Sequence, residues 1–384
     1  MRALFWLLIG TVVYTYLGYP ALLWLTARAG GRRPRSAPVD PASLPRVSIL
    51  LCVHNEAGWL ARRLENLLAL RYPRDHMEIV VGSDGSTDAT ASVARSFEKE
   101  GVRLLEAGER RGKTSLLNDL ITIASGEVVV FTDANARFGE DALRYLVEPF
   151  ASTGVGCVVG ELVYVNGETA VVRAGEGLYW RFENAIKEME GSFGKTVVAT
   201  GAIYAMRRSL CRPLPSAVSD DSLNPLLVLA AGYDVIVEPR AQAFENAATS
   251  LREEFHRKAR MVTRQLGAHR RVGFFLKPLR LGLAVRLVSH KLLRWLAPVL
   301  LLAALLVDLA LLDGWIYRLA AAGGIAGLVA FALGAVAIAL GYRVPAALRL
   351  WVYFCLVNVA AMKGIADFLR GRQRAIWTAS PSTR

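Results

Sequence analysis

Strongly apolar residues are concentrated at the start and near the end of this chain. Residues 3–26 form an almost uninterrupted apolar stretch, and similar stretches follow at about 295–312, 315–340 and 347–369. A helix needs roughly 20 apolar residues to cross a bilayer, and each stretch is long enough or nearly so. The pattern therefore predicts four transmembrane helices, one before and three after a more polar central region.

The central region, from Val47 to Arg271, alternates between short apolar runs and segments with helical periodicity. Alternation at this spacing is typical of right-handed βαβ units, so we expect an α/β fold with a mainly parallel sheet. The predicted strands are Val47–Val53, Glu78–Val81, Val102–Leu105 and Glu127–Phe131, and the predicted helices are Ala57–Leu70, Asp88–Glu100, Lys113–Ala124 and Ser222–Ala231.

These patterns divide the chain into six parts. They are a transmembrane helix (1–27), a basic linker (28–45), an α/β domain (46–271), an amphipathic interfacial helix (272–293), three transmembrane helices (294–370) and a tail (371–384). Arginines after the first span place the linker and the domain in the cytoplasm and the N-terminus outside. Three more spans would place the C-terminus outside as well, whereas the arginines of the tail favour the cytoplasm, so the side of the tail stays open.

Composition narrows the class of partner and compartment. The chain has 384 residues, 53% of them hydrophobic, a mean hydropathy of +0.33 and a net charge of +13. Because basic clusters flank apolar spans, the charge indicates anionic lipids and an anionic substrate rather than nucleic acid. The four cysteines are scattered without CxxC pairing, which argues against a disulfide framework or a cysteine metal cluster.

The segment Ile79–Thr90, IVVGSDGSTDAT, predicts a strand, a tight turn and a capped helix. Asp84 ends that strand, and Asn55 and Glu56 end the strand before it; ligands of open α/β sheets bind at such ends. With the motifs that follow it in order, this segment resembles the membrane-bound family 2 glycosyltransferases. The resemblance implies a GT-A type α/β domain that binds a nucleotide-sugar.

The resemblance also implies roles at the donor site. Asn55, Glu56 and Asp84 would bind the nucleotide of a UDP-sugar, and Lys113 would reach its diphosphate. Asp133 and Asn135 would hold Mg²⁺ or Mn²⁺, since a departing diphosphate needs a hard cation. This chain has D-x-N where the family has D-x-D. Arg257 and Arg260 would stabilise the leaving diphosphate, with Arg257 and Met261 replacing the Gln and Trp of the family's Gln-x-x-Arg-Trp pattern.

At the acceptor side, the resemblance places Thr200, Gly201 and Trp180 near the acceptor. The string Val218–Asp221 lies where the family has its general base. We expect Asp221 to be this base, with Asp220 as the second choice, because inverting transfer needs a carboxylate that takes the proton of the acceptor hydroxyl.

One alternative belongs to another class of enzyme. Ala107–Thr114, AGERRGKT, nearly matches the phosphate-loop pattern of nucleotidases, with Ala107 in place of the first glycine. A membrane-bound P-loop nucleotidase is therefore retained as an alternative. A non-enzymatic receptor is disfavoured by the intact carboxylates and Lys113.

The sequence thus predicts an inverting hexosyltransferase of the cell envelope, a multi-pass protein of the bacterial inner membrane with a cytoplasmic catalytic domain. Its layout resembles bacterial synthases of chitin-like, hyaluronan-like and poly-N-acetylglucosamine polymers, which implies polysaccharide biosynthesis. The acceptor would be a growing polysaccharide or a lipid-linked molecule, and membrane lipids would be partners. A single-transfer enzyme that acts on a lipid or polyprenyl acceptor stays open beside a processive synthase.

Overall fold

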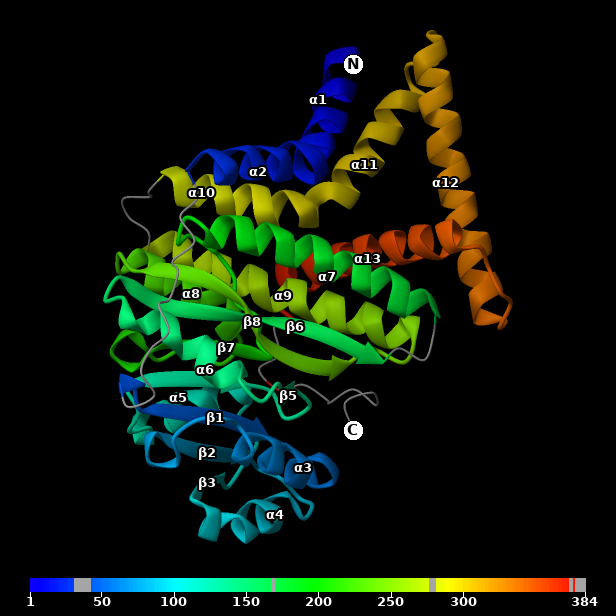
Figure 1. The fold of residues 1–384 in the computed structure, drawn as a ribbon. Coiled ribbons are helices and arrows are strands. Elements are labelled where there is room, and N and C mark those ends of the chain that lie inside the picture. Colours follow the sequence, from blue (N-terminus) through cyan, green and yellow to red (C-terminus); the bar gives the residue numbers. More distant parts are fainter. Residues whose placement is uncertain (31–42, 167–169, 276–280, 373–375, 377–384) are drawn as a thin grey trace.

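A computed structural model describes residues 1–30, 43–166, 170–275, 281–372 and 376. Figure 1 shows a sheet-containing domain with long helices stacked on one side of it and a set of apolar helices beyond these. The sheet has eight strands in the order β3-β2-β1-β4-β7-β6-β8-β5. The chain is thus an α/β domain joined to apolar helices, as the sequence predicts.

The first four strands form a parallel array that matches the prediction closely. β1 pairs in parallel with β2 and β4, and β2 pairs in parallel with β3. The elements are β1 (Val47–Val53), α3 (Ala57–Leu68), β2 (Met77–Asp84), α4 (Thr90–Ser96), β3 (Val102–Ala107), α5 (Lys113–Ile123) and β4 (Val128–Thr132). Short 3₁₀ turns lie at Arg74–His76, Glu98–Glu100, Glu148–Ala151 and Arg208–Leu210.

The second half of the sheet is mixed rather than parallel. β7 pairs antiparallel with β4 and β6, β6 pairs in parallel with β8, and β5 pairs antiparallel with β8. The elements are β5 (Arg137–Phe138), α6 (Ala142–Val147), β6 (Val155–Asn166), β7 (Ile203–Arg207), α8 (Asp220–Ala230) and β8 (Asp234–Asn246). The prediction of a mainly parallel sheet therefore holds only for the first half, because β7 enters the sheet antiparallel to both of its neighbours.

Apolar side chains fill both faces of the sheet. Alternate residues of a strand point to opposite faces, so Ile49 and Leu51 join one core while Leu50 joins the other. The first core lies under α3, α4 and α6, and the second under α5 and α8. Both cores consist mainly of buried side chains, and they fix the strand ends at which the polar motifs lie.

Three long helices cover the sheet edge that faces the apolar helices. They are α7 (Ala170–Gly191), α9 (Leu251–Phe275) and α13 (Ala346–Leu369). α9 and α13 pack closely because Gly364 has no side chain: a Cβ there would lie 2.6 Å from the carbonyl oxygen of Ala259. The hydroxyl of Thr263 donates to the carbonyl of Gly364 at 3.0 Å across the same contact.

The remaining helices are strongly apolar. They are α1 (Arg2–Val13), α2 (Tyr19–Gly30), α10 (Leu281–Leu287), α11 (Leu293–Leu309) and α12 (Trp315–Ala339), with π-helical turns at Tyr14–Gly18 and Val288–Leu292. Four continuous helices, Arg2–Gly30, Gly282–Leu309, Trp315–Ala339 and Ala346–Leu369, are long and apolar enough to cross a membrane. The predicted interfacial helix at 272–293 is divided differently. Its first residues end α9, residues 276–280 lie outside the described residues, and the rest begins the span that continues into α11.

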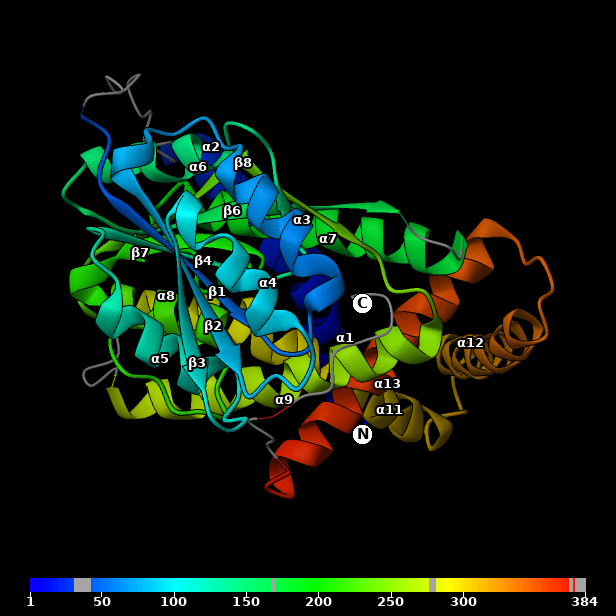
Figure 2. The same cartoon turned by 90° about the horizontal axis from the view of Figure 1, so that it is seen from below.

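The direction of α13 bears on which side of the membrane holds the tail. Figure 1 shows α12 running from the far end of the apolar helices back to the level of α13, whereas α13 lies crosswise to α12 and packs against α9 (Figure 2). Arg2 pairs with Asp313 at 2.6 Å, so the N-terminus and the α11–α12 connection lie at the same end. If α13 lies flat at the domain side of the membrane, only the other three long apolar helices cross it. The two termini are then on opposite sides of the membrane, and the basic tail lies on the same side as the α/β domain.

We therefore expect cysteines introduced by D313C and G371C to react with a membrane-impermeant maleimide from opposite faces of sealed vesicles. Asp313 is exposed at the far end of the apolar helices, and Gly371 follows α13. The unmodified protein, whose four cysteines are half-buried or buried, gives the background. Labelling of both variants from one face would show that α13 spans the bilayer.

Candidate active site

The end of β2 carries a turn held together by side chains of β1. Asp84 ends β2, and its carboxylate accepts hydrogen bonds from the backbone N–H groups of Arg111 and Gly112, both at 2.8 Å. Gly85 has a φ of 59°, and a Cβ there would lie 2.6 Å from the backbone nitrogen of Arg110. Asp84 thus holds the loop before α5 in place, a role that the sequence did not indicate.

Asn55 and Glu56 fix the same turn from the neighbouring strand. Asn55 has a φ of 54°, and its side-chain oxygen accepts from the N–H of Thr87 at 2.8 Å. The N–H of Glu56 donates to the hydroxyl of Thr90 at 2.8 Å. The structure therefore brings Asn55, Glu56 and Asp84 to one edge of the sheet, where the sequence places the nucleotide.

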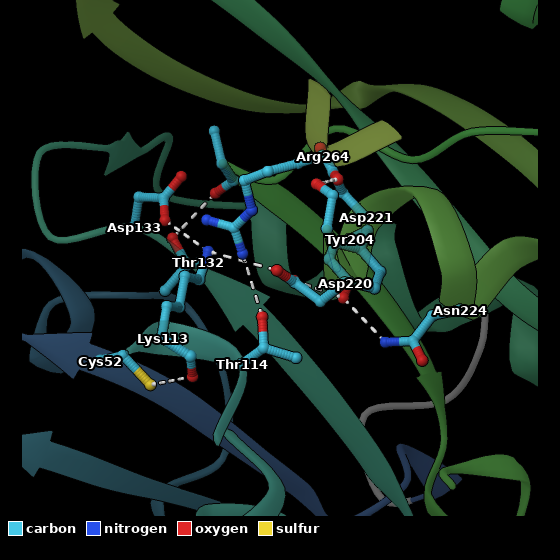
Figure 3. A network of polar contacts seen from close by, with 12 residues as sticks. Cys52, Lys113, Thr114, Thr132, Asp133, Tyr204, Asp220, Asp221, Asn224 and Arg264 are labelled. Atoms are coloured by element: carbon cyan, nitrogen blue, oxygen red, sulfur yellow. Dashed lines mark hydrogen bonds and ion pairs between the residues drawn. The ribbon is translucent and has the colours of Figure 1, made fainter. Parts of the chain in front are cut away.

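Lys113 lies between two carboxylates rather than at the mouth of a phosphate loop. Its Nζ donates to Asp133 Oδ1 at 2.6 Å and lies 3.9 Å from Asp220 Oδ1 (Figure 3). Burial alone would lower the pKa of Lys113, but these two carboxylates outweigh burial and raise it. Lys113 is thus a fixed positive charge that joins the ends of α5, β4 and α8.

The same geometry argues against a P-loop. A phosphate loop works by offering its backbone N–H groups to the phosphates and by pointing its lysine at them. Here the N–H groups of Arg111 and Gly112 bind the Asp84 carboxylate, and Lys113 binds Asp133. The N–H groups and the lysine of the loop before α5 are therefore occupied by contacts within the protein. This geometry does not support the P-loop nucleotidase alternative.

The two adjacent aspartates at the start of α8 have different surroundings. Asp220 is buried and accepts a hydrogen bond from the Tyr204 hydroxyl at 2.8 Å; Asn224 in turn donates to that hydroxyl at 3.0 Å (Figure 3). Asp221 lines a cavity of about 520 Å³, and it also accepts from the hydroxyls of Ser219 and Ser222. Burial and the neighbouring Asp220 charge raise the pKa of Asp221. Of the two, Asp221 is the carboxylate that a ligand can reach.

Asp221 and Asp133 face the same small space. A Cβ on Gly201 would lie 3.4 Å from Asp221 Oδ2 and 3.6 Å from Asp133 Oδ2, so both carboxylates approach the space that the missing side chain leaves open. The segment before β7 that carries Gly201 is irregular. The N–H of Ala199 donates to the Asp221 carbonyl at 2.8 Å, which holds this segment against α8 instead of a strand.

Buried polar residues that sequence reasoning missed hold β4 at the cavity. Arg63 is 3% exposed and donates to the hydroxyl of Thr132 at 2.7 Å, and that hydroxyl donates to the carbonyl of Ala202 at 2.8 Å. Burial lowers the pKa of Arg63 to about 9. Arg63 and Thr132 thus tie the strand that presents Asp133 to the segment of Gly201. No local sequence signal separates Arg63 from an exposed helical arginine.

The predicted acceptor residues Thr200, Gly201 and Trp180 all line the cavity. Thr200 accepts a hydrogen bond from Lys187 Nζ at 2.7 Å. Lys187 is buried, and burial lowers its pKa to about 8. Lys187 is a further cavity residue; its helical spacing from Trp180 and Glu183 was the only signal in the sequence.

The arginines of α9 lie at the cavity with different partners. Arg257 pairs with Glu254 at 2.6 Å and donates to the Tyr164 hydroxyl at 3.1 Å. Within the described residues, Arg260 has no hydrogen bond or ion pair, and burial with the nearby Arg264 and Arg257 lowers its pKa to about 10. Arg264, which the sequence analysis missed, donates to the Val218 carbonyl at 2.9 Å. Arg260 is thus the arginine best placed for an anionic ligand.

A hard divalent cation fits this donor set in part. The Asp133 side chain is 37% exposed, and one of its oxygens faces the cavity, while Asn135 follows it on the same loop. No group of three or more His, Cys, Asp or Glu side chains that could hold a metal occurs among the described residues. One carboxylate with an amide oxygen is enough for Mg²⁺ or Mn²⁺ only when substrate phosphates supply further ligands.

Comparisons with known proteins agree on the class of enzyme. Residues 48–214 match the model of the family described as Glycosyl transferase family 2. A β-monoglucosyldiacylglycerol synthase of Nostoc sp. is 30% identical over 169 residues, which cover 43% of this chain and 35% of that protein. A poly-β-1,6-N-acetyl-D-glucosamine synthase of Staphylococcus epidermidis is 26% identical over 201 residues, which cover 51% of this chain and 48% of that protein. The chain thus matches half or less of the length of these curated relatives.

A solved structure resembles nearly the whole chain. It is a mannosyltransferase from Pyrobaculum calidifontis in complex with GDP-Man and Mn²⁺, with a TM-score of 0.70 and 26% identity. The match covers 96% of this chain and 99% of that one. The arrangement of the α/β domain and the apolar helices is therefore shared with a known glycosyltransferase of the GT-A fold.

Proposed function

Since residues 48–214 belong to glycosyl transferase family 2, we propose that this chain transfers one sugar from a nucleotide-sugar to an acceptor held at the membrane. The transfer inverts the anomeric carbon and gives a β-linkage from an α-linked donor. The enzyme works at the bacterial inner membrane with its α/β domain in the cytoplasm. The observation that carries this proposal is the pair Asp133 and Asp221, which both approach Gly201 on the wall of one cavity.

The proposed reaction is a single displacement. The oxygen of the acceptor hydroxyl forms a bond to the anomeric carbon, its proton goes to the Asp221 carboxylate, and the bond from that carbon to the diphosphate oxygen breaks. The nucleoside diphosphate leaves with the electron pair, and the Arg260 guanidinium stabilises the charge that develops on it. Arg257 was predicted to do the same, but its pairing with Glu254 makes it the weaker candidate.

Asp133 and Asn135 would hold the divalent cation, which supplies charge neutralisation of the diphosphate when bound. Lys113 fixes the orientation of the Asp133 carboxylate through the 2.6 Å contact. Asp84, Asn55 and Glu56 shape the turn beside which the nucleotide base and ribose bind. These residues set the orientation of the donor and leave the proton transfer to Asp221.

The donor is a UDP-sugar or a GDP-sugar. The resemblance of the motifs favours UDP, whereas the solved mannosyltransferase, which matches almost the whole chain, carries GDP-Man. Either nucleotide presents the same diphosphate to Arg260 and Asp133.

A lipid-linked acceptor and a single transfer are favoured over a long polymer. The cavity that holds Asp221 is also lined by Tyr16, Leu350 and Phe354, which belong to the apolar helices. An acceptor with a hydrocarbon tail could therefore reach the catalytic carboxylates from the bilayer side.

The test is product analysis after incubation of the purified protein in lipid nanodiscs with a radiolabelled nucleotide-sugar and a membrane lipid extract. We expect the label in the organic-solvent phase as one species with a single added sugar. Label in a water-soluble polymer of many sugars would support a processive synthase. Label in neither, with every donor, would contradict the proposed function.

The raised pKa of Asp221 predicts a pH dependence. Asp221 accepts a proton only as a carboxylate, so kcat should fall as the pH falls through its raised pKa. Because the Asp220 charge contributes to that raised pKa, Asp220→Asn should shift the acid limb of the kcat–pH profile to lower pH. Asp75→Asn, a change at a side chain that is 82% exposed, serves as the control and should leave the profile unchanged. An acid limb that stays in place in the Asp220 variant would exclude Asp221 as the group that titrates.

A further inference from the structure

Charge is divided unevenly along the cavity. The two catalytic carboxylates lie at the sheet end, while several lysines and arginines line the end formed by α7, α9 and the apolar helices. The cavity is lined by six cationic side chains, Lys187, Arg257, Lys258, Arg260, Lys291 and Arg294, and by four carboxylates, Asp133, Glu183, Asp221 and Glu245. Cations out of contact with bulk water are costly unless an anion accompanies them.

Lys258 is the clearest case. It is 4% exposed, and its Nζ has no hydrogen bond within the described part of the chain. The nearest carboxylate oxygen, Glu254 Oε1, lies 3.4 Å away. Glu254 also pairs with Arg257 at 2.6 Å and accepts from the Tyr353 hydroxyl at 2.8 Å. One carboxylate, Glu254, therefore contacts both Arg257 and Lys258.

Arg294 reaches the same part of the cavity from α11. The Lys258 Nζ lies 3.9 Å from the centroid of the Tyr179 ring, and the guanidinium carbon of Arg294 lies 5.4 Å from that centroid. Both cations therefore lie close to one aromatic ring on α7. Arg294 shares its partner too, because Glu183 binds Lys291 as well as Arg294.

The surroundings of these cations are apolar and aromatic. Trp180 and Phe182 on α7 and Leu350, Phe354 and Val357 on α13 line the cavity beside them. An aromatic ring offers a face to a sugar, and an aliphatic wall suits a hydrocarbon chain. An anion bound at Lys258 and Arg294 would thus lie in the same cavity as Asp133 and Asp221 and beside apolar side chains of α7 and α13.

We propose that Lys258 and Arg294 bind the phosphate of an acceptor in which a phosphate or diphosphate joins the sugar to a long hydrocarbon chain. The proposal rests on the proposed function, since it names the acceptor class for that site. It excludes neutral glycerolipids and neutral oligosaccharides as the preferred acceptors. The donor diphosphate has a separate partner in Arg260, which interacts electrostatically with Asp133, whereas Lys258 contacts Glu254 and the ring of Tyr179.

The test is direct binding of a polyprenyl diphosphate without sugar, compared with the polyprenyl alcohol of equal length, to the full chain in nanodiscs. We expect the diphosphate to bind at least about ten times more tightly than the alcohol. This binding should persist in saturating UDP or GDP, because the nucleotide occupies the donor site. Lys258→Met keeps most of the apolar stem and removes the charge, so it should weaken diphosphate binding by roughly ten-fold or more and leave alcohol binding unchanged.

Two controls separate charge from damage to the fold. Lys258→Arg should retain tight binding of the diphosphate. Lys195→Met removes a lysine that pairs with Asp234 at 2.7 Å outside the cavity lining, and it should change nothing. Arg294→Gln provides a second, independent loss of charge with the same expected result.

Three results would overturn the proposal. They are equal affinity for the alcohol and the diphosphate, displacement of the diphosphate by UDP or GDP, and unchanged diphosphate binding in both Lys258→Met and Arg294→Gln. Displacement by nucleotide would assign the phosphate site to the donor. Because no sugar transfer is needed, a failure of the proposed function would appear only in the product analysis and not in this binding measurement.

Discussion

Replacing Asp221 with Asn should lower kcat by roughly 10²–10⁴-fold, the range that general-base catalysis contributes. The amide has nearly the same shape as the carboxylate but cannot take the proton of the acceptor hydroxyl. Asp221 lines the cavity beside Gly201, whereas the proposed nucleotide-binding residues lie at the strand ends and on α9. Binding of the nucleoside diphosphate, measured by calorimetry, should therefore be retained within a few-fold.

Asp75→Asn is the matched control for this change, because it removes a carboxylate whose side chain is 82% exposed, and it should leave kcat unaltered. Turnover of the Asp221 variant at the rate of the unmodified enzyme would remove the proposed base. In that case Asp220 would not simply take its place, since Asp220 is buried and holds the Tyr204 hydroxyl.

Replacing Asp133 with Asn should lower kcat/KM by roughly 10²–10³-fold, the scale for loss of one group that stabilises a developing charge. The change removes the one carboxylate that ends β4 at the cavity, and it leaves Lys113 with Asp220 at 3.9 Å as its remaining partner. The dependence of the rate on added Mn²⁺ or Mg²⁺ should become weak or disappear. Initial rates across a metal titration measure both effects.

Asn135→Ala is the companion variant to Asp133→Asn. It removes a neutral oxygen ligand, so we expect a smaller loss of rate and a shift of the metal titration to higher concentration. An Asp133 variant with an unaltered metal titration would contradict the metal role of this residue.

The parallel half of the sheet could be predicted from the sequence because the patterns that indicate its strands and turns lie within short segments of the chain. β1, β2 and β4 contain continuous apolar runs, and the turn after Asp84 has a glycine where the backbone needs a positive φ. The mixed half was not predicted, because β6 and β8 pair across long separations that no local periodicity reports. The apolar spans were read from length and composition, but the direction of α13 depends on close packing at Gly364.

Site residues could be predicted from the sequence where a short motif marks the end of a strand. They could not be predicted where the role of a residue depends on its burial in the fold. The sequence indicated Asp133 and Asp221, and the structure brings both to Gly201. It did not reveal that Asp84 holds the loop before α5, because that contact joins residues 27 and 28 positions apart. The cluster of buried cations around Lys258 likewise appears only when α7, α9 and α11 are packed together.

The cavity connects these conclusions. It is bordered by Asp133 and Asp221, by amphipathic helices that carry buried cations, and by the apolar helices. An enzyme that acts on a water-soluble acceptor would have no need of an apolar wall next to its base. The arrangement explains why the transmembrane helices and the α/β domain belong to one catalytic unit.

The most direct test of the central claim is release of nucleoside diphosphate by the purified chain in nanodiscs, over a panel of UDP-sugars and GDP-sugars with Mn²⁺ or Mg²⁺, and with ATP as the control substrate. We predict metal-dependent release from one nucleotide-sugar, stimulated by a membrane lipid extract, and no hydrolysis of ATP. Hydrolysis of ATP without turnover of any nucleotide-sugar would contradict the account.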